Sequence, residues 1–302
     1  MNGNNLEHLL PEHRADAELS AEERVGRIRV DRWISYSRAE GVLTRMRELT
    51  SYPPHDRMPC LLLYGATGMG KTKILARHVR DFPGMFDDVT GITRMQIVIM
   101  QMPPEPDEKS FYSELIDALG SPVYHGHTAS QMRRTARDLL SFVNARMLII
   151  DELHSLLAGT HRQQRILLNT LRFVANDQKL PLVCAGTEEA KRALMTDRQL
   201  ADRFEAVELP CWRNDADFKR LMASFLATLP LRQPSQLLSP GFRKAVLDHT
   251  GGVTVRIVRL IEALAVAAIQ SGRERIDDES LKLLPSLKPL LSMESKSRSA
   301  FA

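Results

Sequence analysis

The stretch Gly65-Ala66-Thr67-Gly68-Met69-Gly70-Lys71-Thr72 decides the fold of this chain. It matches the pattern GxxxxGK[ST], and it lies between an apolar run at 60–64 and a segment with helical periodicity at 71–80. The glycines let the backbone curl so that its N–H groups face phosphates, and the start of the helix adds partial positive charge. Lys71 is expected to reach the β- and γ-phosphates of ATP, and Thr72 to bind Mg²⁺. We predict that all eight residues bind the nucleotide.

A second motif follows about eighty residues later, where the apolar run 147–150 ends in Asp151 and Glu152. In sheets of parallel strands, ligands bind at the carboxyl ends of the strands, so both carboxylates are expected beside the phosphate loop. Asp151 is predicted to hold the magnesium ion through water. Glu152 is predicted to orient or deprotonate the attacking water, which favours ATP hydrolysis over transfer to a bound acceptor.

Strands and helices alternate through the middle of the chain. Apolar runs predict strands at 60–64, 96–100, 147–150 and 181–185, and helical periodicity predicts helices at 71–80, 110–119, 129–144 and 163–177. This alternation predicts a three-layer α/β fold with a mostly parallel sheet. We expect a helical extension at 1–50, the nucleotide-binding core at 51–210, a small all-helical lid at 211–290 and a polar tail at 291–302. Within the extension, Ser20 followed by Glu23 is a predicted capping box. Within the lid, Ser239 and Asp277 are expected to cap helices and Gly272 to end one.

Composition bounds the function only loosely. The 302 residues are 43% apolar and 26% charged, as in soluble proteins, and no apolar run approaches the length of a membrane span. The N-terminus does not follow the plan of a secretory signal, so a cytosolic protein without a membrane partner is expected. Cys60, Cys184 and Cys211 are predicted to be buried, reduced thiols. A net charge of +4 permits nucleic-acid binding without indicating it.

The two nucleotide motifs resemble those of AAA+ ATPases, and that resemblance assigns three further residues. Thr187, at the end of the apolar stretch 182–186, resembles the polar sensor of the family. Arg203, followed by Phe204, resembles the arginine finger that the end of a helix presents to the neighbouring subunit, with Arg198 as the reserve. Arg256, after Gly251-Gly252, resembles the second sensor at the entrance to the lid helix, where it would contact the nucleotide. A finger that acts on a neighbour implies a homo-oligomer.

Within AAA+ proteins, the chain is most similar to the TniB and TnsC group of transposition regulators, and nearest to TniB. The stretches that carry this likeness are 27–36, 101–103, 147–154 and 199–204, within a resemblance that covers about 25–285. The first of them implies that Trp33 lies near the adenine, where Tyr36 could also stack. The resemblance further implies an ATP-dependent protein that assembles as a ring or helical filament on double-stranded DNA without sequence preference. It would recruit a transposase, together with a target-selection accessory protein, and disassemble on hydrolysis, bound to DNA in the bacterial cytosol.

Residues that could contact DNA lie between the second and third predicted strands. Thr128 with Gln131 forms a predicted capping box, and a helix start beside a lysine is a sequence-independent phosphate site. In TniB-like and TnsC-like proteins this region faces the duplex. The candidates are Lys109, Thr128, Arg133, Arg134 and Arg137. The alternative is that Thr128 only caps its helix and the arginines lie on a solvated face.

Three other functions share these motifs: a helicase loader or replication initiator, a secretion-system assembly ATPase that does not bind DNA, and a small-molecule P-loop kinase. The Asp-Glu pair disfavours the kinase. His154 could be a catalytic base, although a histidine on a helix surface beside the site is the simpler expectation. Trp212 is expected in the core where the two domains meet.

Overall fold

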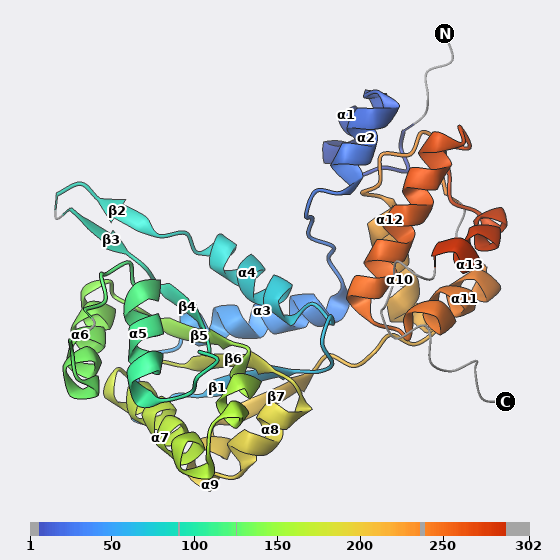
Figure 1. Ribbon diagram of the computed structural model, residues 1–302. Coiled ribbons are helices and arrows are strands. Elements are labelled where there is room, and N and C mark those ends of the chain that lie inside the picture. The colour runs from blue at the N-terminus through green and yellow to red at the C-terminus, as the bar shows by residue number, and fades with distance from the viewer. Residues whose placement is uncertain (1–5, 90, 125, 236–238, 288–302) are drawn as a thin grey trace, which may run out of the picture. The chain divides into compact units, whose positions relative to one another are not determined.

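The computed structural model describes residues 6–89, 91–124, 126–235 and 239–287 (Figure 1). The chain forms two compact units, Arg38–Pro210 and a second unit that joins Met1–Ser37 to Cys211–Ala302. Residues up to Ser37 therefore group with the C-terminal helices, whereas the sequence analysis treated 1–50 as a separate extension. The predicted tail 291–302 lies outside the described residues.

A five-stranded parallel sheet forms the centre of the first unit, in the order β4-β5-β6-β1-β7. Its strands are β1 (Cys60–Tyr64), β4 (Ile97–Gln101), β5 (Met147–Asp151), β6 (Leu182–Gly186) and β7 (Phe204–Glu208). All residues of β1, β5 and β6 are buried, which is why these strands read as continuous apolar runs. The chain runs from β1 to the edge strand β4 and then returns through β5 and β6, so β6 and β7 flank β1.

Helices cover both faces of this sheet. One core contains alternate residues of β1, β4, β5 and β6 together with apolar residues of the helices that follow β4, β5 and β6. These helices are α5 (Glu108–Ala118), α6 (Ala129–Phe142), η1 (Leu153–Ala158), α7 (His161–Asp177) and α8 (Glu188–Met195), with the short α9 (Arg198–Ala201) beside them. On the other face lie α3 (Ser37–Thr50) and α4 (Lys71–Asp81), where Thr50 reaches Met147 and α4 packs on β4 and β6. The predicted three-layer α/β fold is confirmed.

Two features of this unit were not predicted. β7 is an edge strand whose residues are all exposed or half-buried, and Glu205 and Glu208 give it no apolar run. The hairpin of β2 (Met85–Asp87) and β3 (Ile92–Arg94) extends from the end of α4 (Figure 1). Its described side chains are exposed or half-buried. Its sequence therefore lacks the alternation of apolar and polar residues that predicts a strand with one buried face.

The second unit contains only helices among its described residues. They are α1 (Pro11–Glu18), α2 (Ala21–Ile28), α10 (Ala216–Leu226), α11 (Pro240–Thr250), α12 (Thr254–Gln270), η2 (Asp278–Leu283) and α13 (Leu284–Leu287). The predicted caps are confirmed at Ser20, whose side chain forms a capping box with Glu23, and at Ser239, which accepts from Phe242 N–H. Cys211, predicted to be buried, is exposed, because it lies in the irregular segment that leads into this unit.

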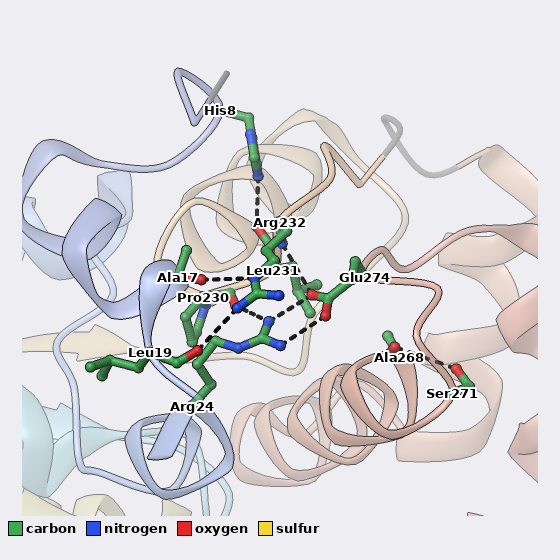
Figure 2. A network of polar contacts seen from close by, with 10 residues as sticks. All are labelled: His8, Ala17, Leu19, Arg24, Pro230, Leu231, Arg232, Ala268, Ser271 and Glu274. Carbon is green, nitrogen blue, oxygen red and sulfur yellow. Dashed lines mark hydrogen bonds and ion pairs between the residues drawn. The ribbon is translucent and has the colours of Figure 1, made fainter. Parts of the chain in front are cut away.

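A buried ion pair ties the N-terminal helices to this unit (Figure 2). The side chain of Arg24, in α2, is 2% exposed and donates to both carboxylate oxygens of Glu274, at 2.6 and 2.8 Å, and to the carbonyl of Pro230. Arg232 donates its backbone N–H to the same carboxylate. Its guanidinium donates to the carbonyls of Ala17 and Leu19. Residues 17–24 are thereby fixed to segments more than two hundred positions away.

Burial tends to raise the pKa of Glu274, but the hydrogen bonds and charges of Arg24 and Arg232 outweigh it and lower that pKa below 4.5. A carboxylate with a lowered folded-state pKa contributes stability above its unfolded-state pKa of 4.5, and this contribution is lost as pH falls through the folded-state value. The network therefore stabilises the helical unit at neutral pH.

We expect Glu274→Gln to lower the stability of the helical unit at pH 7 by about 3–5 kcal/mol, because it leaves the Arg24 charge buried without its partner. Urea unfolding followed by circular dichroism measures the loss, and the difference from the wild type should shrink below pH 4.5. Glu279→Gln is the matched control, since Glu279 forms an exposed pair with Lys282. Equal losses in the two variants would contradict a structural role for the buried pair.

Candidate nucleotide-binding and hydrolysis site

The backbone of the loop between β1 and α4 has positive φ angles at Gly65, Gly68 and Gly70, a conformation that favours glycine. Gly65 has φ 153°, and a Cβ atom there would lie 2.4 Å from the carbonyl oxygen of Leu209. Gly70 caps α4 in the left-handed conformation, with φ 94°. The first N–H groups of α4 have no partners within their own helix and lie at this loop, where the helix dipole adds positive character. The loop can therefore bind phosphate oxygens, as the sequence predicts.

Lys71 lies inside this loop and is 7% exposed. Its ammonium donates to the carbonyl oxygens of Gly65 and Ala66, at 2.9 and 3.0 Å. Burial lowers the pKa of Lys71, and the negative charges of Glu152 and Asp151 oppose that effect. The lysine is thus held among backbone acceptors at the place where the phosphates of a nucleotide would bind.

Thr72 and Asp151 join the loop to the second motif. The Thr72 hydroxyl donates to one oxygen of Asp151 at 2.7 Å, and the other Asp151 oxygen accepts from Glu152 N–H at 2.8 Å. Both residues line a pocket with Glu152, Gln101 and the end of β4. A hydroxyl beside a carboxylate is an oxygen ligand set of the kind that Mg²⁺ accepts, so these residues fit the predicted ion.

Glu152 borders the same pocket and has a left-handed backbone, with φ 54° and ψ 37°. This conformation ends β5 abruptly and starts η1, and a non-glycine residue adopts it only where its surroundings enforce it. His154 lies in η1, and its Nε2 is 3.1 Å from a carboxylate oxygen of Glu152. His154 was predicted to lie beside the site, and its contact with Glu152 was not predicted.

Thr187 follows β6 at the same edge of the sheet. Its hydroxyl oxygen is buried and has no hydrogen-bond partner among the described residues. A buried hydroxyl without a partner is costly, so it marks a position where a ligand atom could bind. Ahead of it, Gly186 leaves no room for a side chain, because a Cβ atom would lie 2.6 Å from the Cβ of Ala190. The sensor role that the resemblance assigns to Thr187 stays a prediction.

Arg203 lies at the amino-terminal ends of the strands, whereas the loop lies at their carboxyl-terminal ends. Its carbonyl accepts from the N–H of Cys60, the first residue of β1, and its guanidinium donates to the side chain of Asn176. The loop begins after the last residue of β1, about 16 Å further along the strand. One expectation is wrong in detail, because α9 ends at Ala201 and Phe204 is already the first residue of β7. The reserve candidate, Arg198, is exposed on α9.

The other predicted nucleotide contacts belong to the helical unit. Trp33 is half-buried in the irregular segment after α2, and Arg256 lies in the first turn of α12. Trp212 is 7% exposed, donates its indole N–H to the Thr254 hydroxyl and meets the Tyr36 ring edge-on at 5.1 Å. Trp212 thus packs in the interior of this unit with Tyr36, a residue that the sequence analysis considered for adenine stacking.

Two of the arginines proposed to contact DNA are engaged within the protein. Arg137 forms a two-point ion pair with Asp177, at 2.7 and 2.8 Å. Arg133 lies 3.4 Å from Glu108, and both guanidinium groups lie within 6 Å of the Phe173 ring. Lys109, Thr128, Arg134 and Arg137 are exposed, and Arg133 is half-buried. The capping box of Thr128 with Gln131 is confirmed.

Comparison with solved structures supports the fold. The chain is 16% identical to the Aeropyrum pernix ORC2 protein in its ADPNP–ADP complexes, with a TM-score of 0.59 over 91% of this chain and 74% of that chain. Drosophila ORC bound to DNA is 12% identical, with a TM-score of 0.58 over 94% and 68%. Domain III of Thermotoga maritima DnaA is 17% identical, with a TM-score of 0.52 over 94% and 99%. No curated protein sequence matches the chain significantly.

The strand order, the phosphate loop after the central strand β1 and the Asp-Glu pair after β5 define a P-loop ATPase of the AAA+ class, an enzyme that binds and hydrolyses ATP. The family model described as "Bacterial TniB protein" matches residues 24–214, more than half of the chain. The chain belongs to the TniB family. Among its described residues, no helix has the length and apolar character needed to cross a membrane.

We expect Lys71→Ala to abolish ATP binding, and Glu152→Gln to retain binding but to lower the turnover rate by about 10²–10⁴-fold, because only the glutamate acts on the attacking water. Removal of Mg²⁺ with a chelator should stop turnover in every variant. Binding of a fluorescent ATP analogue and phosphate release measure the two effects. Lys73→Ala, at an exposed position of α4, is the control. Loss of ATP binding in Glu152→Gln would contradict the assigned role.

Proposed function

We propose that this TniB-family ATPase regulates DNA transposition by assembling on double-stranded target DNA in its ATP-bound form. In this proposal it binds DNA without sequence preference, recruits and activates a transposase together with a target-selection accessory protein, and disassembles when ATP is hydrolysed. The family match over residues 24–214 is the observation that carries the proposal. Mg²⁺ would be held at the proposed site by the Thr72 hydroxyl and, through water, by the Asp151 carboxylate.

Assembly into a ring or filament is supported by the place of Arg203. Arg203 lies beside the first residue of β1, and the phosphate loop follows the last residue of that strand. Arg203 is therefore too far from the loop of its own subunit to reach it. In a head-to-tail assembly, the amino-terminal ends of the strands in one subunit can face the phosphate loop of the next subunit. An arginine placed there would stabilise the charge that develops on the γ-phosphate during hydrolysis. Neighbouring subunits would then share each active site.

Mixed assemblies test this arrangement. Arg203→Ala should lower the turnover rate by about 10³-fold or more, since an arginine finger contributes that much. Lys71→Ala should stop turnover at its own loop because it no longer binds ATP. In an equal mixture, about a quarter of the interfaces would combine an intact loop with an intact neighbouring arginine, so about a quarter of the wild-type rate should return. Arg198→Ala tests the reserve candidate in the same assay, and Arg192→Ala, exposed on α8, is the control. No recovery in a mixture that still assembles would contradict a shared site.

The proposed DNA contacts centre on Lys109, Thr128 and Arg134. Lys109 lies in the first turn of α5 and Arg134 in the second turn of α6, and these two helices pack against each other. Contacts of this kind bind phosphates without reading sequence. Arg133 is retained as a weaker candidate because Glu108 already lies beside it. At the start of α5, the carboxylate of Asp107 accepts from Lys109 N–H and Ser110 N–H, so the Lys109 side chain, rather than this helix start, would contact DNA.

The decisive experiment measures binding to a random-sequence DNA duplex with ATP, with ADP and without nucleotide, at two salt concentrations, and images the same samples. We expect ATP-dependent binding that weakens with salt, together with rings or filaments. Lys109→Ala and Arg134→Ala should each weaken binding to all sequences alike and reduce the salt dependence by about one unit of slope. Arg192→Ala, exposed on α8, is the control.

The alternatives give different results in the same experiment. A helicase loader or replication initiator would share the ATPase core but would bind a helicase or one particular origin sequence. A secretion-system assembly ATPase would not bind the duplex with any nucleotide. Absence of DNA binding under every condition would therefore contradict the proposal and leave an ATPase whose partner is a protein.

A further inference from the structure

The imidazole of His154 lies against the carboxylate that is proposed to act on the attacking water. Its Nε2 is 3.1 Å from one oxygen of Glu152, and the two side chains are 33% and 37% exposed. The other ring nitrogen, Nδ1, is buried and has no hydrogen-bond partner among the described residues. One edge of the ring therefore faces the interior of the protein, and the other faces Glu152.

The position of His154 is fixed by its neighbours in η1. Leu153 and Leu156 are fully buried, and η1 packs against α7, α8 and β6. The turn is closed by a hydrogen bond from Ser155 N–H to the Glu152 carbonyl, at 2.9 Å. The backbone nitrogen of His154 also lies 3.5 Å from the place that a Cβ atom of Gly186 would occupy. The histidine is thus anchored to the sheet, whereas Glu152 ends in a side chain with three rotatable bonds.

We propose that His154 is a positioning residue for hydrolysis, which holds one oxygen of the Glu152 carboxylate and leaves the other free to orient the attacking water. This inference rests on the proposed role of Glu152. A base oriented by a third group is a recurrent arrangement in enzymes, because a side chain that is already oriented loses less freedom in the transition state. At 3.1 Å, Nε2 lies close enough to the carboxylate oxygen to donate to it when this nitrogen carries a proton.

The same geometry argues against His154 as the base itself. Nε2 is engaged with Glu152, and the buried Nδ1 cannot meet a water molecule in the pocket. The pocket is lined by Glu152, together with Thr72 and Asp151, and not by His154. The histidine therefore acts through the glutamate.

His154→Phe is the most informative substitution. Phenylalanine keeps a ring in the same space and removes both nitrogens, and no hydrogen bond of Nδ1 is lost because none is present. We expect the kcat for ATP to fall about tenfold, since misplacing a catalytic group by an ångström can cost up to 10²-fold, while KM and the affinity for nucleotide stay within about twofold. His154→Gln can place an N–H group near the Nε2 position and should recover most of the rate.

The controls separate this inference from the role of Glu152. His161→Ala removes an exposed histidine at the start of α7 and should leave kcat unchanged. A normal rate in Glu152→Gln would overturn the role of the glutamate and the positioning inference with it. If Glu152→Gln is impaired but His154→Phe keeps the wild-type kcat, or if His154→Gln is no faster than His154→Phe, the positioning inference alone is overturned. Thermal unfolding of each variant confirms that the compared proteins are folded.

Discussion

The hydrogen bond from Thr72 to Asp151 joins the two halves of the nucleotide site, and the rest of the core arranges the residues on either side of it. Thr72 follows β1 and Asp151 ends β5, and these two strands are not neighbours because β6 lies between them. The bond can form only if the carboxyl ends of three parallel strands reach the same edge in register. Pairing of Leu62 with Cys184 and of Cys184 with Ile150 supplies that register. The parallel sheet is therefore the constraint on which the site depends.

The site also balances charge. Lys71 is buried beside Asp151 and Glu152, whose negative charges offset the cost of burying an ammonium group. Its present acceptors are two backbone carbonyls of the loop, which are weaker partners than phosphate oxygens. A nucleotide phosphate could therefore replace them without leaving the lysine unpaired. At Gly65 and Gly70 the loop has positive φ angles, which let its backbone curl.

Local sequence was sufficient for the parts of the structure that depend on local chemistry. The phosphate loop, the buried strands and the caps at Ser20, Thr128 and Ser239 were all predicted, because each requires particular residue types at a fixed spacing. β7 was missed because an exposed edge strand needs no apolar run. Cys211 was predicted to be buried because its neighbours in the sequence are apolar. It is exposed, because apolar neighbours are a poor guide to burial in an irregular segment.

Contacts between segments that are distant in the sequence were not predicted, for a different reason. The pairs Arg137–Asp177 and Arg24–Glu274 join residues 40 and 250 positions apart, and nothing in the spacing of a single sequence identifies such partners. The same holds for Arg133 and Glu108, 25 positions apart. Three arginines that could have been assigned to solvent or to DNA are therefore engaged with carboxylates of the protein itself. Arg134 differs from Arg133 and Arg137 in that, among the described residues, its side chain forms no ion pair with a carboxylate.

In the proposed mechanism, the two ends of the strands have different roles. Each subunit carries the loop and the carboxylates at the carboxyl-terminal ends of its strands and Arg203 at their amino-terminal ends. In the proposed assembly, hydrolysis therefore requires a neighbouring subunit. By linkage, a nucleotide held between two subunits must stabilise their contact by as much as the contact strengthens nucleotide binding. Hydrolysis removes the γ-phosphate that both subunits would hold, and it thereby weakens the interface that made hydrolysis possible. Within the proposed assembly, disassembly then follows from the placement of these residues and needs no separate switch.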